Sequence, residues 1–302
     1  MRGSYRTMAG QEGMAVLLAV MIVAVAAGIG MTLITVSDSM LRRADSSARR
    51  AQADAMALPA ILWVAGGLPH ARGEEDRAEK AFMPVDGGSV KWEIYDMQGR
   101  FDLNCVAPGG AAIPANVESF RRLAILAGQD AIIAETLADW LDSDDETRPD
   151  GAEDGYYQSL EEPYLAANGV LNDLNDVALV KGFTPRATQA LENMICALPR
   201  PAAVNVNTAT AETLAAVIAG IDIETAERLV QIRGERGFES IDEFKKLLPE
   251  RAVLPPGGVT LKSDFFGIKI VCRFGDLVAQ YSALVEAGTS NRGPKIVWMK
   301  AD

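Results

Sequence analysis

The chain has 302 residues, and its 41 acidic and 29 basic side chains give it a formal net charge of −12. This length is sufficient for two modest domains or one large domain with a buried core. Aromatic residues make up only 6% of the chain, and so acidic a surface repels nucleic acids and anionic membranes. His70 is the single histidine, which leaves most hydrolytic mechanisms without a base, so an enzyme is the least favoured class.

The cysteines do not suggest a metal site. Cys105, Cys196 and Cys272 are far apart and form no C-x-x-C motif. One disulfide with a third free thiol is compatible with the sequence, and all three pairings remain open.

The N-terminal region contains a long apolar segment. Residues Met14 to Val36 form 23 consecutive uncharged positions, and a helix of this length spans roughly 35 Å at about 1.5 Å per residue. The apolar region of a secretory signal peptide has only about 7 to 15 residues, so the sequence predicts a retained transmembrane helix. Helix-forming residues continue from Ser37 to Ala60 and extend it to about 45 residues. Its membrane-contacting positions include Leu17, Leu18, Val20, Ile22 and Val23.

Charged residues on either side of this segment do not settle its orientation. Arg2 and Arg6 precede it, whereas four arginines follow it, so the positive-inside count favours neither side or the wrong one. Long downstream domains often translocate regardless of such counts, and an acidic body with spaced cysteines suits an oxidising compartment. We therefore expect the body of the protein to lie outside the cytoplasm.

The short polar start resembles a type IV prepilin leader, which is cut after a glycine on the cytoplasmic face while the apolar helix is retained. Gly13 is a better cleavage position than Gly10, because a cut after Gly10 would leave Gln11 and Glu12 at the head of the membrane helix. The resemblance implies a leader of residues 1–13, a mature chain that begins at Met14, and methylation.

One position departs from that pattern. Most pilins carry glutamate as the fifth mature residue, and Leu18 occupies this position here. A carboxylate in lipid is costly and usually functional, and in pilins it is thought to pair with the amine of a neighbouring subunit. A subunit without it has less reason to lie below another copy.

The soluble part begins and ends with strand patterns. Residues 66–88 are predicted to form a loop, and the alternation over Ser89–Tyr95 predicts a half-buried strand. A turn at Met97–Arg100 followed by extended chain at Phe101–Asn104 predicts a β-hairpin. Three further strands are expected at Phe265–Phe274, Leu277–Glu286 and Lys295–Met299. These strands flank a helical insertion over residues 106–260, which indicates an α+β fold.

The insertion contains a weak internal repeat, in which residues 117–142 correspond to residues 211–236. The second copy, which starts at Asn205-Val206-Asn207-Thr208-Ala209, resembles the helix-hairpin-helix module of DNA-uptake and repair proteins. Asp222 and Glu224 occupy positions where a glycine and a small residue are expected, and a carboxylate there repels phosphate. A packing scaffold is therefore favoured over DNA binding. The alternative, a membrane-tethered DNA-binding protein of the uptake type, depends on Arg228, Arg233, Arg236, Lys245 and Lys246.

An acidic segment lies between the two copies. Eight carboxylates fall within the sixteen positions from Asp139 to Asp154, with Arg148 as the only basic residue. Oxygen ligands without histidine or cysteine favour Ca²⁺ over Zn²⁺. Counted from Asp142, the spacing is similar to an EF-hand loop, although Thr147 replaces the turn glycine. A solvated acidic loop is the alternative, but three large rings, those of Trp140, Tyr156 and Tyr157, favour an ordered site.

The order of these motifs is similar to that of the minor pseudopilin K family of type II secretion. The resemblance rests on the prepilin-like start, Gly99-Arg100-Phe101-Asp102-Leu103-Asn104, Asp139-Trp140-Leu141-Asp142-Ser143-Asp144, Gly151-Ala152-Glu153-Asp154 with Tyr156-Tyr157, Pro163-Tyr164, and Asn205-Val206-Asn207-Thr208-Ala209. It implies one or two bound Ca²⁺ ions. We expect the ligands among Asp139, Asp142, Asp144, Asp145, Glu146, Asp150, Glu153 and Asp154, with Asp173 and Asp176 as a second group.

The resemblance also implies an architecture and a cellular place. The fold would be α+β, with a long N-terminal transmembrane helix, an antiparallel pseudopilin sheet and a large all-α insertion with helix-hairpin-helix-like repeats. Its parts would be a leader (1–13), a transmembrane segment (14–36), a periplasmic helix (37–64), a β region (65–105), the insertion (106–260, with the acidic loop at 139–157) and returning strands (261–302). The expected role is a non-enzymatic subunit at the pseudopilus tip that supports protein export. It would be anchored in the inner membrane, with its C-terminal domain in the periplasm. The expected partners are minor pseudopilins I and J, the major pseudopilin, prepilin peptidase and the inner-membrane secretion platform, with no nucleic acid.

Overall fold

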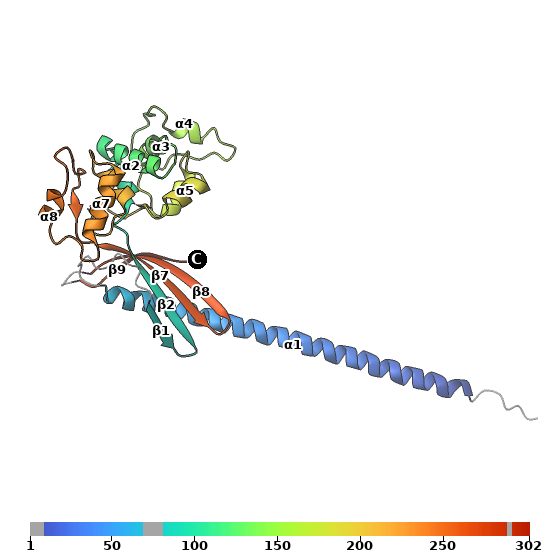
Figure 1. The fold of residues 1–302 in the computed structure, drawn as a ribbon. Coiled ribbons are helices and arrows are strands. Elements are labelled where there is room, and N and C mark those ends of the chain that lie inside the picture. The colour runs from blue at the N-terminus through green and yellow to red at the C-terminus, as the bar shows by residue number, and fades with distance from the viewer. Residues whose placement is uncertain (1–8, 69–80, 289–291) are drawn as a thin grey trace, which may run out of the picture.

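The computed structural model describes residues 9–68, 81–288 and 292–302, so His70 lies outside the described residues. Its first element is a single helix, α1 (Ala9–Gly66), of 58 residues, which continues through Pro59 and is longer than predicted at both ends. Within the described chain, α1 is the one helix long and apolar enough to cross a membrane, and its most apolar part is not buried by any other element. In Figure 1 this part projects away from the rest of the molecule.

A five-stranded sheet follows, with every neighbouring pair antiparallel and the order β1-β2-β7-β8-β9. The strand predictions near residues 89–95, 265–274, 277–286 and 295–299 are confirmed. Since β2 pairs with β7 along its whole length, the insertion between them leaves the sheet unbroken. The strands are β1 (Ala81–Val85), β2 (Gly88–Asp96), β7 (Phe265–Phe274), β8 (Leu277–Glu286) and β9 (Lys295–Ala301).

Two predictions for the β region are wrong. The expected loop at 66–88 contains β1, a five-residue edge strand. Pro84 lies within this strand, and a proline in the sequence favours a loop over a strand. An edge strand tolerates a proline, since the missing N–H faces away from the ladder. The predicted hairpin also does not form. β3 (Phe101–Asp102) instead runs parallel to β4 (Ile195–Cys196), because both edges of β2 are already occupied by β1 and β7.

The last turns of α1 pack against one face of the sheet. Small residues at helical spacing let the helix lie close to the strands, and they are followed by larger apolar residues. The ring of Trp63 meets that of Trp92 edge-on, with centroids 5.3 Å apart. Buried helix positions include Ala53, Ala57, Ala60, Ile61, Val64 and Ala65, which pack in one core with sheet residues such as Val90, Ile268, Ile270, Cys272 and Tyr281.

The insertion lies on the opposite side of the sheet from α1 (Figure 1). It is mainly helical but not wholly so, because β3–β4 and a second parallel pair, β5 (Val204–Asn205) with β6 (Val259–Thr260), cross-link its ends. One apolar core runs through both predicted copies. Its helices are α2 (Pro114–Leu126), α3 (Ile133–Leu141), α4 (Asp154–Tyr157), α5 (Pro185–Leu191), α6 (Ala211–Val217), α7 (Ile223–Arg233) and α8 (Ile241–Lys246), with 3₁₀ turns η1 (Leu103–Cys105) and η2 (Leu174–Leu179).

All three cysteines are free thiols in this structure. Cys105 is half-buried in η1, whereas Cys196 and Cys272 are buried. Cys272 lies in the core between α1 and the sheet, while Cys196 belongs to a separate small cluster with Phe265 and Leu284.

A polar network joins the insertion to the sheet. One carboxylate oxygen of Asp96, at the end of β2, accepts hydrogen bonds from Asn205 Nδ2 (3.0 Å), Thr208 Oγ1 (2.6 Å) and Ser263 Oγ (2.7 Å). Nearby, the amide of Gln98 bonds backbone groups on both sides of the junction. These contacts fix the position where the chain leaves the sheet and the position where it returns.

Replacing Asp96 with alanine is expected to lower the free energy of unfolding by about 3 kcal/mol, because three buried donors lose their shared acceptor. Guanidinium unfolding of the full chain measures this. Asp86→Ala, at an exposed turn position, is the matched control and is expected to have little effect. Equal stability of the two variants would show that the junction does not depend on this carboxylate.

Candidate metal centre

The acidic segment begins in the last turn of α3, which positions two carboxylates on one side of the helix. Asp139 lies within the helix and Asp142 is its C-cap, and both are fully buried. The chain then runs outward through exposed residues 143–147 and returns, so that Glu153, only 4% exposed, also becomes buried. The carboxylates of Asp139, Asp142 and Glu153 are thereby all brought into the interior.

Asp139 organises the returning loop. Its Oδ1 accepts a hydrogen bond from Arg148 Nη1 (2.8 Å), and its Oδ2 accepts from the backbone N–H groups of Ala152 (2.8 Å) and Arg148 (3.2 Å). The loop passes so close that a Cβ at Gly151 would lie 1.9 Å from Asp139 Oδ2. Only glycine fits at this position without a shift of the loop or of the aspartate.

Asp142 and Glu153 retain oxygen atoms without partners. Asp142 Oδ2 accepts from Arg148 Nη1, but its Oδ1 is buried and has no hydrogen-bond partner among the described residues. Both carboxylate oxygens of Glu153 are also buried without a hydrogen-bond partner among the described residues. Burial, followed by the charges of Asp139 and Asp142, raises the pKa of Glu153 to about 7. Burial also raises the pKa of Asp142, against the opposing effect of Arg148.

Orphaned buried carboxylate oxygens are suitable ligands for a hard cation, because charge and coordination would repay their lost hydration. In the described part of the chain, however, no three acidic, histidine or cysteine side chains are already arranged as a metal site. Arg148 supplies the positive charge at this position, contacting Asp139 and Asp142 and approaching Glu135 to 3.9 Å. The donor set fits calcium, and its arrangement would have to adjust around the ion.

The other predicted ligands differ in their surroundings. Asp144, Asp145, Glu146 and Asp150 are exposed, although Asp144 and Asp145 are close enough to raise the pKa of Glu153. Asp154 begins α4, and its Oδ1 accepts from the backbone of Ala166 (2.9 Å). The structure therefore groups Asp139, Asp142 and Glu153 most tightly.

The second predicted group is engaged elsewhere. Asp173 and Asp176 form a capping box at the start of η2, in which each side chain accepts backbone N–H groups. Asp173 also forms an ion pair with Lys300 of β9 (2.9 Å). Their assignment as ligands stays a prediction, as it does for the other eight carboxylates.

Aromatic rings pack together next to the acidic segment. The Trp140 and Tyr157 ring centroids lie 5.0 Å apart, and Tyr157 is fully buried and stacks on Tyr164 at 5.2 Å. Lys181 donates to the carbonyl of Gly151 (3.0 Å) and lies over the exposed ring of Tyr156. The rings thus hold an ordered loop. The sequence marked Arg148 as the lone base in an acidic run and Gly151 as part of a motif, but it predicted neither residue's contact with Asp139. It gave no signal for Lys181.

The second helical copy does not present a phosphate site. Asp222 caps α7, and its carboxylate accepts from the backbone N–H of Thr225 (2.9 Å). Hydrogen bonding from the Thr225 side chain, followed by that from its backbone N–H, lowers the pKa of Asp222. A negative charge therefore occupies the helix N-terminus, where a phosphate would bind. Asn207 instead forms two hydrogen bonds with the backbone of Phe238 (2.7 and 3.1 Å). These residues stabilise the packing of the module.

Comparison with known proteins gives consistent matches. Two family models, both described as Type II secretion system (T2SS), protein K, match residues 99–200 and 204–259. A type II secretion system protein K of Pseudomonas aeruginosa is 38% identical over 170 residues, which is 55% of this chain and 50% of the relative. That of Pectobacterium carotovorum is 30% identical over 64% of each chain, and that of Aeromonas hydrophila is 26% identical over 73% of each. The matched region thus spans about half of the first relative and somewhat less than two thirds of the second.

The fold is also similar to that of a solved structure. A chain in the crystal structure of the GspK-GspI-GspJ complex from enterotoxigenic Escherichia coli superposes with a TM-score of 0.69. The match covers 88% of this chain and 99% of that one at 22% identity, which shows a shared fold. The two family models together cover just over half of the chain and continue from the end of β2 through the insertion. On these matches, the chain belongs to the type II secretion system protein K family.

Proposed function

We propose that this protein is a non-enzymatic minor pseudopilin at the tip of the type II secretion pseudopilus, where it supports export of folded proteins across the outer membrane. The observation that carries this proposal is the division of the molecule into two ends (Figure 1). The apolar half of α1 is exposed along its length, whereas the last turns of the helix, from Ala53 onward, pack into the folded body. Such a helix fits a membrane before assembly and a bundle of similar helices afterwards.

The anchor would place the protein in the inner membrane as a single-pass subunit with its body in the periplasm. Prepilin peptidase would cut between Gly13 and Met14, and the new terminus would be methylated. The side chains that follow are strongly exposed, Leu17 at 72% and Val23 at 67%, as expected for groups that contact lipid or partner helices. Leu18 supplies no carboxylate to pair with a subunit above it.

The insertion supports a position at the end of a fibre. It stands on the face of the sheet opposite α1, and the Asp96 network holds it there. A body of this bulk would leave no room for a further subunit above it. The major pseudopilin and the inner-membrane secretion platform would then contact the chain only on the side of α1, away from the insertion.

Calcium would stabilise the insertion through the acidic segment. Asp142 and Glu153, with Asp139 beside them, would hold the ion, since three of their buried oxygens have no hydrogen-bond partner among the described residues. Asp144 and Asp145 lie near enough to contribute charge. The ion would supply the positive charge and oxygen coordination that this group of carboxylates needs to remain ionised when buried.

The proposed partners are minor pseudopilins I and J, because the similar fold is that of a chain solved in complex with GspI and GspJ. When the full chain is co-expressed with both pseudopilins from the same bacterium, we expect the three to elute together in size-exclusion chromatography. A second preparation lacking only this chain provides the control for an I–J complex alone. Elution of this chain separately from an intact I–J complex would contradict the assignment.

A further inference from the structure

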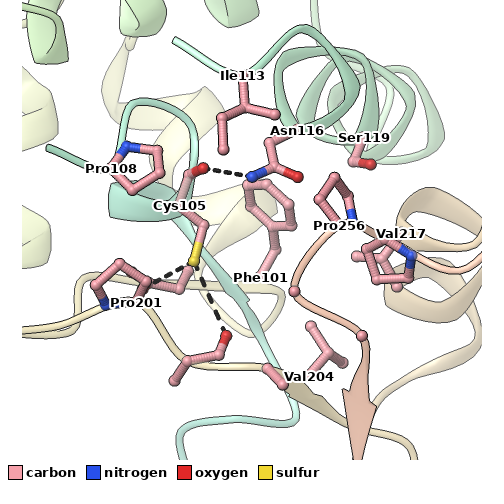
Figure 2. A pocket seen from close by; sticks show the side chains of 16 residues that line it. Phe101, Cys105, Pro108, Ile113, Asn116, Ser119, Pro201, Val204, Val217 and Pro256 are labelled. Atoms are coloured by element: carbon pink, nitrogen blue, oxygen red, sulfur yellow. Dashed lines mark hydrogen bonds between the residues drawn. The ribbon is translucent and has the colours of Figure 1, made fainter. Parts of the chain in front are cut away.

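A pocket of about 350 Å³ lies where the two helical copies meet (Figure 2), and no residue of the acidic segment is among the described residues that line it. Its walls come from the η1 turn, the start of α2, the segment before β5, the end of α6 and the loop before β6. This volume is within the range of small-molecule sites, which are common at such interfaces. The pocket thus has both the size and the place of a binding site.

The walls are apolar and rigid. Phe101, Val204 and Val217 contribute buried apolar side chains. Pro201 and Pro256 lie at the exposed rim, and the φ angle of each is fixed by its ring. Preformed walls of this kind lower the entropic cost of binding.

One buried acid stands in this apolar lining. Asp102 is 3% exposed, and its Oδ1 accepts hydrogen bonds from the backbone N–H groups of Asn104 (3.2 Å) and Leu198 (3.1 Å). Its Oδ2 has a single donor among the described residues, the Cys105 thiol at 3.4 Å, and a thiol is a weak donor. One carboxylate oxygen is therefore poorly satisfied.

The other polar groups of the lining do not compensate this charge. Asn116 Nδ2 donates to the carbonyl of Cys105 (2.6 Å), and the Ser119 hydroxyl donates to the carbonyl of Ala115 (2.9 Å). The described lining residues include no lysine or arginine. A ligand that carries its own positive charge would supply what the pocket lacks, because a charge-assisted hydrogen bond is the strong complement of a buried carboxylate.

We propose that this pocket binds a small organic ammonium ion with a compact apolar body. The ammonium group donates to Asp102 Oδ2, and the apolar body packs against Phe101, Val204 and Val217. This inference is independent of the proposed place in the pseudopilus, since it rests on the pocket alone.

The test uses the full chain in lipid nanodiscs, with empty nanodiscs to subtract partitioning into lipid. The probes are 4-fluorobenzylamine and its neutral analogue 4-fluorobenzyl alcohol, observed by ¹⁹F NMR line broadening at pH 8. Burial raises the pKa of Asp102 to about 7, so the carboxyl is mostly ionised at this pH. We expect the amine to bind at least about tenfold more tightly than the alcohol, the effect of one charge-assisted hydrogen bond.

Two variants locate the binding. Asp102→Asn keeps an acceptor for the two backbone N–H groups and should reduce amine affinity to that of the alcohol. Ala203→Trp fills the pocket from a half-buried position and should abolish binding of both probes. This variant therefore locates the binding even if Asp102→Asn does not fold. Asp222→Asn is the matched control, a helix-capping aspartate outside the pocket that should leave binding unchanged. Equal affinity for amine and alcohol, or unchanged amine binding in Ala203→Trp, would overturn the proposal.

Discussion

Replacing Gly151 with alanine is expected to lower the free energy of unfolding of the full chain by about 3 kcal/mol. The added Cβ would lie 1.9 Å from Asp139 Oδ2, so either the loop or the aspartate must move. Movement of Asp139 weakens its hydrogen bonds to Ala152 N and Arg148 N, which hold the returning loop. Denaturant unfolding followed by near-ultraviolet circular dichroism reports this, because Trp140 and Tyr157 pack beneath the loop.

Gly155 provides the matched control for this substitution. It lies four residues further along in α4, and a Cβ there would meet nothing within 4 Å. Gly155→Ala should therefore be neutral, or stabilising by about 0.5 kcal/mol through reduced freedom of the unfolded chain. If Gly151→Ala proved as stable as Gly155→Ala, the close approach of the loop to Asp139 would be wrong.

In the absence of calcium, the stability of the protein is expected to depend strongly on pH. In the metal-free chain the pKa values of Asp102 and Glu153 are raised from 3.8 and 4.5 to about 7, chiefly by burial. A raised carboxyl pKa means that the folded state holds the proton more tightly than the unfolded state does. The resulting stability is fully present below about pH 4 and is lost as the pH rises through about 7. With a chelator, the protein should therefore be more stable at pH 5 than at pH 8.

Calcium should counter the share of this loss that comes from Glu153. At about 100 times its dissociation constant, calcium would add about 2.7 kcal/mol at pH 8, and little at pH 5, where Glu153 is protonated. Thermal unfolding at both pH values with EGTA and with excess calcium measures these differences. Glu153→Gln should abolish most of the calcium response, whereas Glu250→Gln, at an exposed position, should retain it. An identical melting temperature with calcium and with chelator at pH 8 would contradict the proposed calcium site.

Periodic and alternating patterns predicted the long elements well. The strands expected at 265–274 and 277–286 match the structure, and buried and less buried residues alternate along most of each strand because one face of the sheet packs on α1. The hairpin at 97–104 was wrong because the sequence could not reveal that β1 and β7 occupy both sides of β2. Pairing partners distant in the chain are set by packing, which local patterns do not contain.

In the acidic segment, too, the sequence predicted the region but not its three-dimensional arrangement. Its composition marked the region, but composition could not separate buried Asp139, Asp142 and Glu153 from exposed Glu146 and Asp150. That separation depends on the path of the loop, which the close fit of Gly151 against Asp139 determines. The pocket around Asp102 gave no signal in the sequence, because segments on both sides of the insertion build it.

The most direct test of the central claim is the mass of the mature protein purified from membranes of the producing bacterium, with its N-terminal peptide sequenced. We expect a chain that begins at Met14 and retains the whole apolar part of α1. A mature chain that begins beyond Val36, recovered without membrane, would contradict it, because no anchor would remain to join the body to a filament.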